Sequence, residues 1–226
     1  ALILIAQQTK DTQRGKSVGL FFGATFVASL LGLCLSGILH WRLIFIIPAV
    51  FGFLLWIHMY FYLPNFKENI AGLKINYLSA FKNSAILSIF IYIFFISLFY
   101  HGIQQWLGVY FSQRFKLTQW VISMLITLTS LSGVFGEVLG GYGADKIGRL
   151  NCANAGIILM LISVFLLSFK MPLMILGSIM AIWGLGWTFN HAAISTLLTD
   201  LPKEFINEVA SLNSSVRFIS GGIGAT

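Results

Sequence analysis

The stretch GGYGADKIGR, residues 140–149, places three charged residues, Asp145, Lys146 and Arg149, between two long apolar segments. Residues 117–136 precede it and residues 150–169 follow it, and neither segment contains Lys, Arg, Asp or Glu. A bilayer core needs about 20 mostly apolar residues for each spanning helix. The stretch is therefore predicted to be a short turn at a membrane surface, whose first glycines end one spanning helix and whose successor, Leu150, begins the next.

Uncharged segments of this kind recur along the whole chain. Hydrophobic residues make up 58% of the sequence and charged residues 9%, against about 25% charged in ordinary soluble proteins. The pattern predicts an all-α, polytopic membrane protein with six complete spans, at residues 17–41, 43–66, 83–113, 117–136, 150–169 and 171–199. The first eight residues resemble the end of another span and Val209 begins a further one, so we expect the chain to be part of a larger protein.

The positive charges are distributed as topology signals rather than as a nucleic-acid surface. The net charge is +7, but no basic face or basic helix is present. Alternate inter-helix segments carry nine Lys or Arg on one side (Lys10, Arg14, Lys16, Lys67, Lys74, Lys82, Lys146, Arg149, Lys203) and four on the other (Arg42, Arg114, Lys116, Lys170). The positive-inside rule assigns the nine to the cytoplasm. The segment at 140–149 is therefore expected to face the cytoplasm.

The longest inter-helix segment, residues 64–82, mixes charges with apolar residues at helical spacing. Ile70, Leu73, Tyr77 and Phe81 recur every three to four residues. This spacing predicts an amphipathic helix on the membrane surface, and the segment also suits a linker between two helical bundles.

The residues of the opening stretch carry a family resemblance. Gly141, Asp145, Lys146, Gly148 and Arg149 resemble the cytoplasmic signature of the major facilitator superfamily, roughly G-x-x-x-D-R/K-x-G-R. At least four helices precede the stretch and the longest loop lies two helices upstream, which suits the second copy of that signature. The resemblance implies a chain that runs from the end of helix 4 into helix 11. It divides the chain into residues 1–63 (end of the N-terminal half-bundle), 64–83 (central loop) and 84–226 (C-terminal half-bundle).

Three interpretations of the turn remain at this stage. A glycine-rich loop can bind phosphate at a helix N-terminus, but such a site needs a preceding strand, and here a membrane helix precedes. Lys146 and Arg149 could serve only as topology anchors. Alternatively, the turn is a gate latch in which Asp145 lies against the positive end of a facing helix. The resemblance implies that the facing helix is the one that starts with Arg14, Lys16 and Ser17.

Glu137, Arg217 and His191 are ionisable residues in or directly beside predicted spans, where a charge is costly and marks a functional candidate. Glu137 and Arg217 lie at similar depths and could form a structural ion pair, or Glu137 could exchange a proton. His191 titrates nearest neutral pH and is either a coupling residue or a hydrogen-bonded packing residue beside Asn190. Glycine pairs at 19/23 and 136/140 fit close helix packing in lipid.

Polar and aromatic residues in two spans are candidates for a substrate cavity. The stretch FYHGIQQWLGVYF, residues 99–111, places Tyr100 and Gln104 on one helix face and His101 and Gln105 on another. Part of it also suits the aromatic belt at the outer interface. The complete candidate set is Tyr100, His101, Gln104, Gln105, Trp106, Trp183, Trp187 and Asn190.

The expected function is secondary active transport by alternating access. Residues 211–224 resemble helix 11 of drug and metabolite exporters, which favours proton-coupled export of small molecules; the alternatives are a proton symporter for sugars or organic acids and, in another class, a membrane receptor or membrane-embedded enzyme. No paired catalytic constellation, metal spacing around Cys34 or Cys152, cofactor motif or Walker motif is present. We expect no enzymatic activity, no cofactor and no metal. The expected partners are the lipid bilayer, a small molecule and protons, for a monomer in the plasma membrane.

Overall fold

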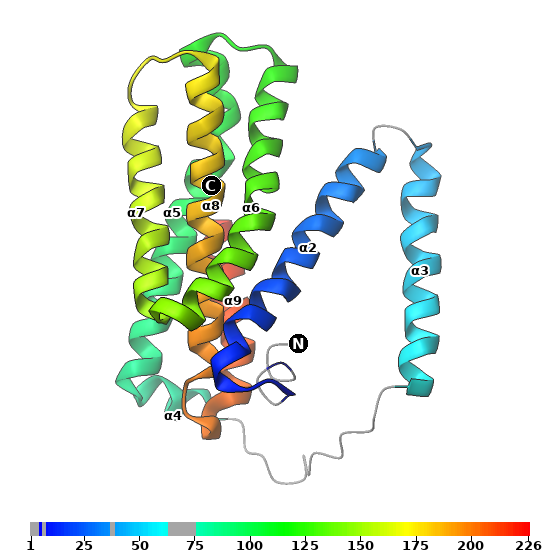
Figure 1. The fold of residues 1–226 in the computed structure, drawn as a ribbon, viewed down its shortest axis with the longest axis vertical. Helices are drawn as coiled ribbons and strands as arrows, with labels where there is room; N and C mark the ends of the chain where they lie inside the picture. The colour runs from blue at the N-terminus through cyan, green and yellow to red at the C-terminus, as the bar shows by residue number, and fades with distance from the viewer. Residues whose placement is uncertain (1–4, 6–7, 37–38, 63–75) are drawn as a thin grey trace. The chain divides into compact units, whose positions relative to one another are not determined.

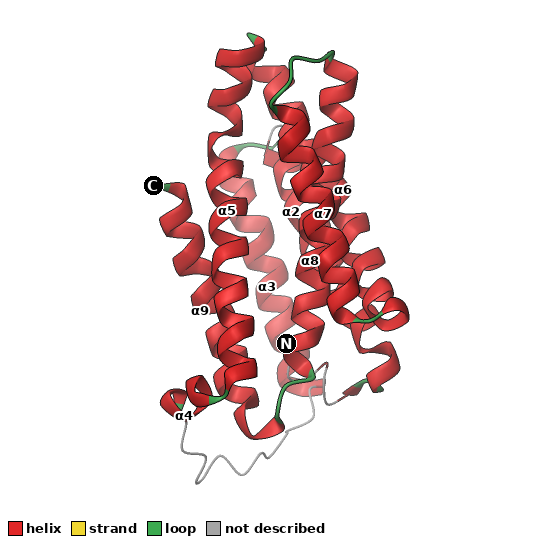
Figure 2. Ribbon diagram, turned by 90° about the vertical axis from the view of Figure 1, so that its left-hand side faces the viewer, coloured by secondary structure: helices red, strands yellow, loops and turns green. Residues whose placement is uncertain are grey.

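The computed structural model describes residues 5, 8–36, 39–62 and 76–226. Regular structure in this part of the chain is entirely helical (Figure 2). The long helices are α2 (Arg14–Ser36), α3 (Trp41–Tyr62), α5 (Ser84–Phe115), α6 (Gln119–Ile147), α7 (Arg149–Leu167), α8 (Leu173–Thr199) and α9 (Ile206–Ala225). The short helices are the 3-10 helices η1 (Asp11–Gln13), directly before α2, and η2 (Lys203–Phe205), between α8 and α9, and the helix α4 (Tyr77–Lys82), directly before α5.

Within the described residues, six helices are long and apolar enough to cross a membrane. Their candidate spans are Asp11–Gly32, Arg42–Tyr62, Ser84–Phe115, Gln119–Ile147, Arg149–Leu167 and Leu173–Thr199, one for each uncharged segment of the sequence. The prediction of an all-α, polytopic membrane fold is thereby confirmed. The further span predicted from Val209 corresponds to the helix α9, which is not among these six spans.

The chain forms two compact units. One comprises Ala1–Phe26 together with Ile75–Thr226, and the other comprises Val27–Lys74, which holds the end of α2 and all of α3. The first unit contains every residue of the site described below. The division of the chain at residues 63 and 83 into two half-bundles and a central loop stays a prediction. Most of the segment at 64–82 lies outside the described residues, and Tyr77–Lys82 forms the short helix α4.

Side chains and backbone geometry at the ends of the helices explain where they begin and stop. The Asn83 side chain accepts hydrogen bonds from the N–H groups of Ala85 (3.0 Å) and Ile86 (3.3 Å), which caps the start of α5. At its other end, Lys116 has a left-handed backbone, with φ of 55°. The helix α6 continues to Ile147, and only Gly148, with φ of +92°, separates it from α7. The prediction that the first glycines of the opening stretch end the helix is therefore wrong: they lie inside α6, where their lack of a side chain serves packing.

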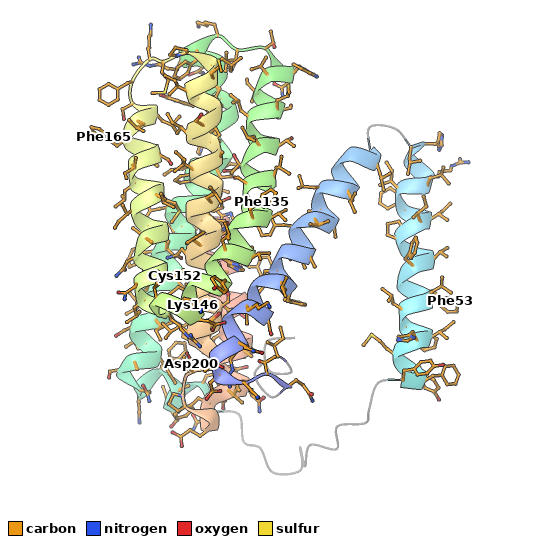
Figure 3. All side chains as sticks on the ribbon, viewed as in Figure 1. Phe53, Phe135, Lys146, Cys152, Phe165 and Asp200 are labelled. Carbon is orange, nitrogen blue, oxygen red and sulfur yellow. The ribbon has the colours of Figure 1, made fainter. Side chains whose placement is uncertain are left out.

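Small residues let the helices of the first unit approach closely. In this unit α6 packs against α8, α7 against α8, and α5 against α9 (Figure 1). A Cβ at Gly184 of α8 would lie 2.1 Å from the carbonyl oxygen of Thr129 in α6, and one at Gly156 of α7 would lie 2.5 Å from the carbonyl oxygen of Gly186. In lipid, helix association depends on such close backbone contacts. Large apolar side chains such as Phe135 and Phe165 instead point outward, as lipid-facing residues do (Figure 3).

Adding one methyl group at the α6–α8 contact tests this packing. Gly184→Ala is expected to lower the stability of the protein by about 1–3 kcal/mol, because the new Cβ meets backbone atoms that cannot rotate away. Gly108→Ala is the matched control, since a Cβ there meets only Ile122 Cγ2 at 3.9 Å. Thermal unfolding in detergent micelles measures both. Equal melting temperatures for the two variants would contradict the close α6–α8 packing.

Candidate functional site

Asp145 is held at the start of α2. Its Oδ1 atom accepts a hydrogen bond from the backbone N–H of Gly15 (2.9 Å) and its Oδ2 atom accepts one from Lys16 (2.8 Å). The first N–H groups of a helix have no partner within the helix, and the helix dipole favours a negative charge there. One carboxylate therefore satisfies two otherwise unpaired donors.

Glycines on both helices make this contact possible. A Cβ at Gly15 would lie 2.4 Å from the carbonyl oxygen of Gly141, and one at Gly141 would lie 2.2 Å from the carbonyl oxygen of Gly15. A Cβ at Gly19, one turn further along α2, would lie 2.4 Å from the Glu137 carbonyl oxygen. The two helices can bring the Asp145 carboxylate within reach of the α2 backbone only because these positions lack side chains.

A network of five charged side chains surrounds this contact. Arg149 lies 3.2 Å from Asp145 and donates to Asp200 at 3.0 Å; Arg14 donates to the other carboxylate oxygen of Asp200 at 3.1 Å and also pairs with Asp11. Figure 3 shows Asp200 beside the first turn of α2. Both arginines and the Asp145 side chain are largely shielded from solvent. The network thus joins the starts of α2 and α7 to the end of α8.

The other predicted residues of the latch contribute less. Lys146 is exposed, with its Nζ atom 5.6 Å from the centre of the Tyr142 ring. Lys16 takes part through its backbone N–H, while its side chain is exposed. The Ser17 hydroxyl donates to the Gln13 carbonyl (3.2 Å) rather than capping α2. Arg14 is in the network, but its carboxylate partners are Asp11 and Asp200.

A second charged group is buried deeper in the first unit. Glu137 of α6 has no exposed surface, and its Oε1 atom lies 2.7 Å from Nδ1 of His191 in α8. The His191 ring also packs edge-on against Phe22, with 4.5 Å between ring centres. This hydrogen bond joins a carboxyl group of α6 to an imidazole of α8.

Arg217 of α9 is close to this pair but does not bond to it. Its Nε atom donates to the Asn213 side chain (2.9 Å), while Nη1 and Nη2 are buried without a hydrogen-bond partner. The Oε2 atom of Glu137 is likewise buried without a partner. Of the two alternatives for Glu137, the structure shows no direct ion pair with Arg217 among the described residues, and the carboxylate bonds to His191 instead.

His191 and Arg217 border a cavity of about 620 Å³. Its polar lining comes from α5, α8 and α9: Ser97, His101, His191, Asn213, Ser214 and Arg217. Its aromatic lining comes from α2, α8 and α9: Phe21, Phe22, Phe26, Trp187 and Phe218. The volume lies within the range of about 300–1,000 Å³ that is typical of small-molecule sites. Aromatic rings together with convergent polar groups are typical of such a site.

The predicted cavity residues divide into three groups. His101 and Trp187 line the cavity. Behind them Tyr100 stacks on Trp187, with ring centres 3.8 Å apart, and on Trp183, while Gln104 accepts a hydrogen bond from the Trp183 indole (3.0 Å). The remaining three lie elsewhere: Gln105 and Trp106 are exposed, and Asn190 is buried and donates to Tyr92 and to the Ala153 carbonyl.

Several residues of the site were not predicted from the sequence. Asp11 and Asp200 complete the charge network. The only signal available for them in the sequence was that acids occur in the same inter-helix segments as basic residues. Ser97 and Asn213 line the cavity from α5 and α9. A small polar residue in an apolar helix gives too weak a signal to select it. No cluster of three His, Cys, Asp or Glu that could hold a metal occurs among the described residues.

Comparison with known proteins identifies the family of the chain. The family model described as Major Facilitator Superfamily matches residues 1–225. Searches of curated proteins and of solved structures each found no match.

Removing His191 tests whether it stabilises the buried Glu137 carboxylate. His191→Leu is expected to cost about 3–5 kcal/mol of stability, because it leaves a buried charge without its partner. The double variant Glu137→Gln/His191→Leu should recover much of that loss, since the side chain then carries no charge. Denaturant unfolding in detergent measures the cycle. Losses that simply add would show that the two side chains do not interact.

Proposed function

Because the chain belongs to the major facilitator superfamily, a family of membrane transporters, we propose that it is a secondary active transporter that moves small molecules by alternating access and is coupled to protons. The single observation that carries this proposal is the buried Glu137–His191 pair beside an aromatic cavity. A carboxyl group and an imidazole in hydrogen-bond contact can take up and release a proton next to a bound ligand. The same cavity supplies room for a small organic molecule.

The Asp145 contact supplies the proposed gate on the cytoplasmic side. Its two hydrogen bonds and the surrounding network hold the start of α2 against the end of α6. Opening of that side requires the two helix ends to separate, so the contact stabilises only the state in which they touch. Charge-assisted hydrogen bonds contribute about 1.5–3 kcal/mol, which is sufficient to shift a two-state equilibrium roughly tenfold to a hundredfold toward the closed state.

Two directions of transport are candidates. Export in exchange for protons is favoured by the resemblance of residues 211–224 to helix 11 of drug and metabolite exporters. Proton symport of organic acids is favoured by Arg217, whose two Nη atoms are buried without a partner at the cavity. In either case we propose a monomer in the plasma membrane, because residues of one chain make the charge network and the cavity.

Neutralising Asp145 tests the gate. Asp145→Asn is expected to slow transport at least about tenfold without loss of membrane insertion, because a neutral amide binds the α2 N–H groups and the arginines more weakly. The assay follows proton movement in pyranine-loaded proteoliposomes under an imposed pH gradient, with a panel of cationic dyes and aromatic carboxylates. Glu204→Gln is the matched control, since Glu204 is exposed on the same side. Transport by Asp145→Asn at the rate of this control would refute the gate.

Removing the acid from the buried pair tests proton coupling. Glu137→Gln is expected to abolish the proton movement that accompanies transport, because the amide cannot exchange a proton. Exchange of a labelled for an unlabelled substrate across the same vesicles should continue, since that reaction needs no net proton transfer. Persistence of proton-coupled accumulation in this variant would exclude Glu137 as the coupling group.

A further inference from the structure

Arg217 presents unused hydrogen-bond donors at the cavity. A guanidinium carries five N–H donors, and in Arg217 only Nε has a hydrogen-bond partner, Asn213. Leaving the donors of a buried charge unpaired costs free energy. The helix α9 is fixed in place at its far end, where a Cβ at Gly224 would lie 2.3 Å from the Leu98 carbonyl oxygen of α5. The unpaired donors therefore belong to a well-packed helix and point to a partner that is absent from the structure.

The partner is anionic, because Arg217 is the charged residue that lines the cavity in the described part of the chain. The ionisable groups near it on the surrounding helices are Tyr92 and His101 on α5, Glu137 on α6 and His191 on α8. Glu137 is fully buried behind His191 and is not part of the cavity lining. The segment of α2 that faces the cavity contributes phenylalanines. A cationic ligand would therefore meet an unpaired positive charge and no exposed carboxylate.

The shape and polarity of the walls narrow the ligand further. Trp187 presents a flat indole that is itself held by stacking on Tyr100, and Phe22 and Phe26 line the cavity from α2. Burial of a flat apolar body against such rings is favourable. The planar fork of a guanidinium matches a carboxylate with two parallel hydrogen bonds. Ser97, whose buried hydroxyl also has no partner, lies on the same cavity as a further polar contact.

We propose that the cavity binds an organic anion made of a carboxylate and a flat apolar body, with Arg217 receiving the carboxylate. This inference rests on the proposed transport function and names the substrate class for it. Arg217 is the specificity-determining residue, and the aromatic side chains contact the apolar body of the ligand.

Calorimetric binding to the purified protein in detergent tests the ligand class. The probes are 2-naphthoate, the neutral 2-naphthamide and the cationic 2-naphthylmethylamine, which share one ring system. Naphthoate is expected to bind at least about tenfold more tightly than the amide, because only the carboxylate forms charge-assisted bonds, and the amine should bind most weakly. Tighter binding of the amine, or no binding of naphthoate, overturns the proposal.

Variants separate a binding role of Arg217 from a structural one. Arg217→Gln should weaken naphthoate binding at least about tenfold and leave amide binding unchanged, whereas Arg217→Lys should retain part of the preference because the charge remains. Lys170→Gln removes an exposed positive charge elsewhere and should change neither affinity. Glu137→Gln should raise naphthoate affinity, since it removes a competing negative charge near Arg217. Equal loss of naphthoate and amide binding in both Arg217 variants would overturn the proposal.

The binding test and the transport test fail separately. If naphthoate binds through Arg217 but no probe moves protons in proteoliposomes, the ligand class stands and the transport proposal fails. If cationic dyes drive proton movement and naphthoate does not bind, the transport proposal stands and the ligand class fails.

Discussion

The close approach of α2 and α6 is the constraint on which the rest of the site depends. Gly15 and Gly141 bring the two backbones so near that any side chain at either position would collide with a carbonyl oxygen. At that separation a short aspartate side chain reaches two helix-terminal N–H groups directly. The same crossing places Phe22 of α2 against His191. The packing of small residues therefore determines the geometry of the Asp145 contact and also positions one wall of the cavity.

The charged residues of the first unit fall into two sets with opposite degrees of pairing. In the network around Asp145 every carboxylate and both arginines have charged partners, and Asp145 also lies at the N-terminal end of α2, where the helix dipole favours a negative charge. In the cavity set, Glu137 has one unpartnered oxygen and Arg217 has two unpartnered nitrogens. Fully paired charges stabilise one arrangement of the helices. Buried polar groups without a partner instead favour binding of a ligand that supplies the missing partner. The first set suits a gate and the second suits a binding site.

The sequence predicted how deep a residue lies along its membrane helix. It did not predict toward which neighbouring helix the side chain of that residue points. The uncharged segments located six spans, and the resemblance in the opening stretch located the Asp145 contact with the start of α2. Their similar depth made an ion pair between Glu137 and Arg217 one alternative, but in the structure the Glu137 carboxylate bonds to His191, which faces it from α8. Likewise Gln105 and Trp106 lie in the correct span yet point away from the cavity. Asp200 was missed because its partner Arg14 is 186 residues away, and no periodic pattern reports a contact of that kind.

The ligand class and the direction of transport are linked by thermodynamics. A carboxylate at Arg217 and the negative charge of Glu137 repel each other across a poorly solvated site, so protonation of the Glu137–His191 pair would strengthen binding of the anion. Linkage is reciprocal, and bound anion would raise the proton affinity of the pair by the same factor. A carrier moves the anion and the proton together when each strengthens binding of the other. Exchange instead requires that binding of one ligand displaces the other. An anionic substrate therefore argues for symport, and a cation that competes with the proton at Glu137 would argue for export by exchange.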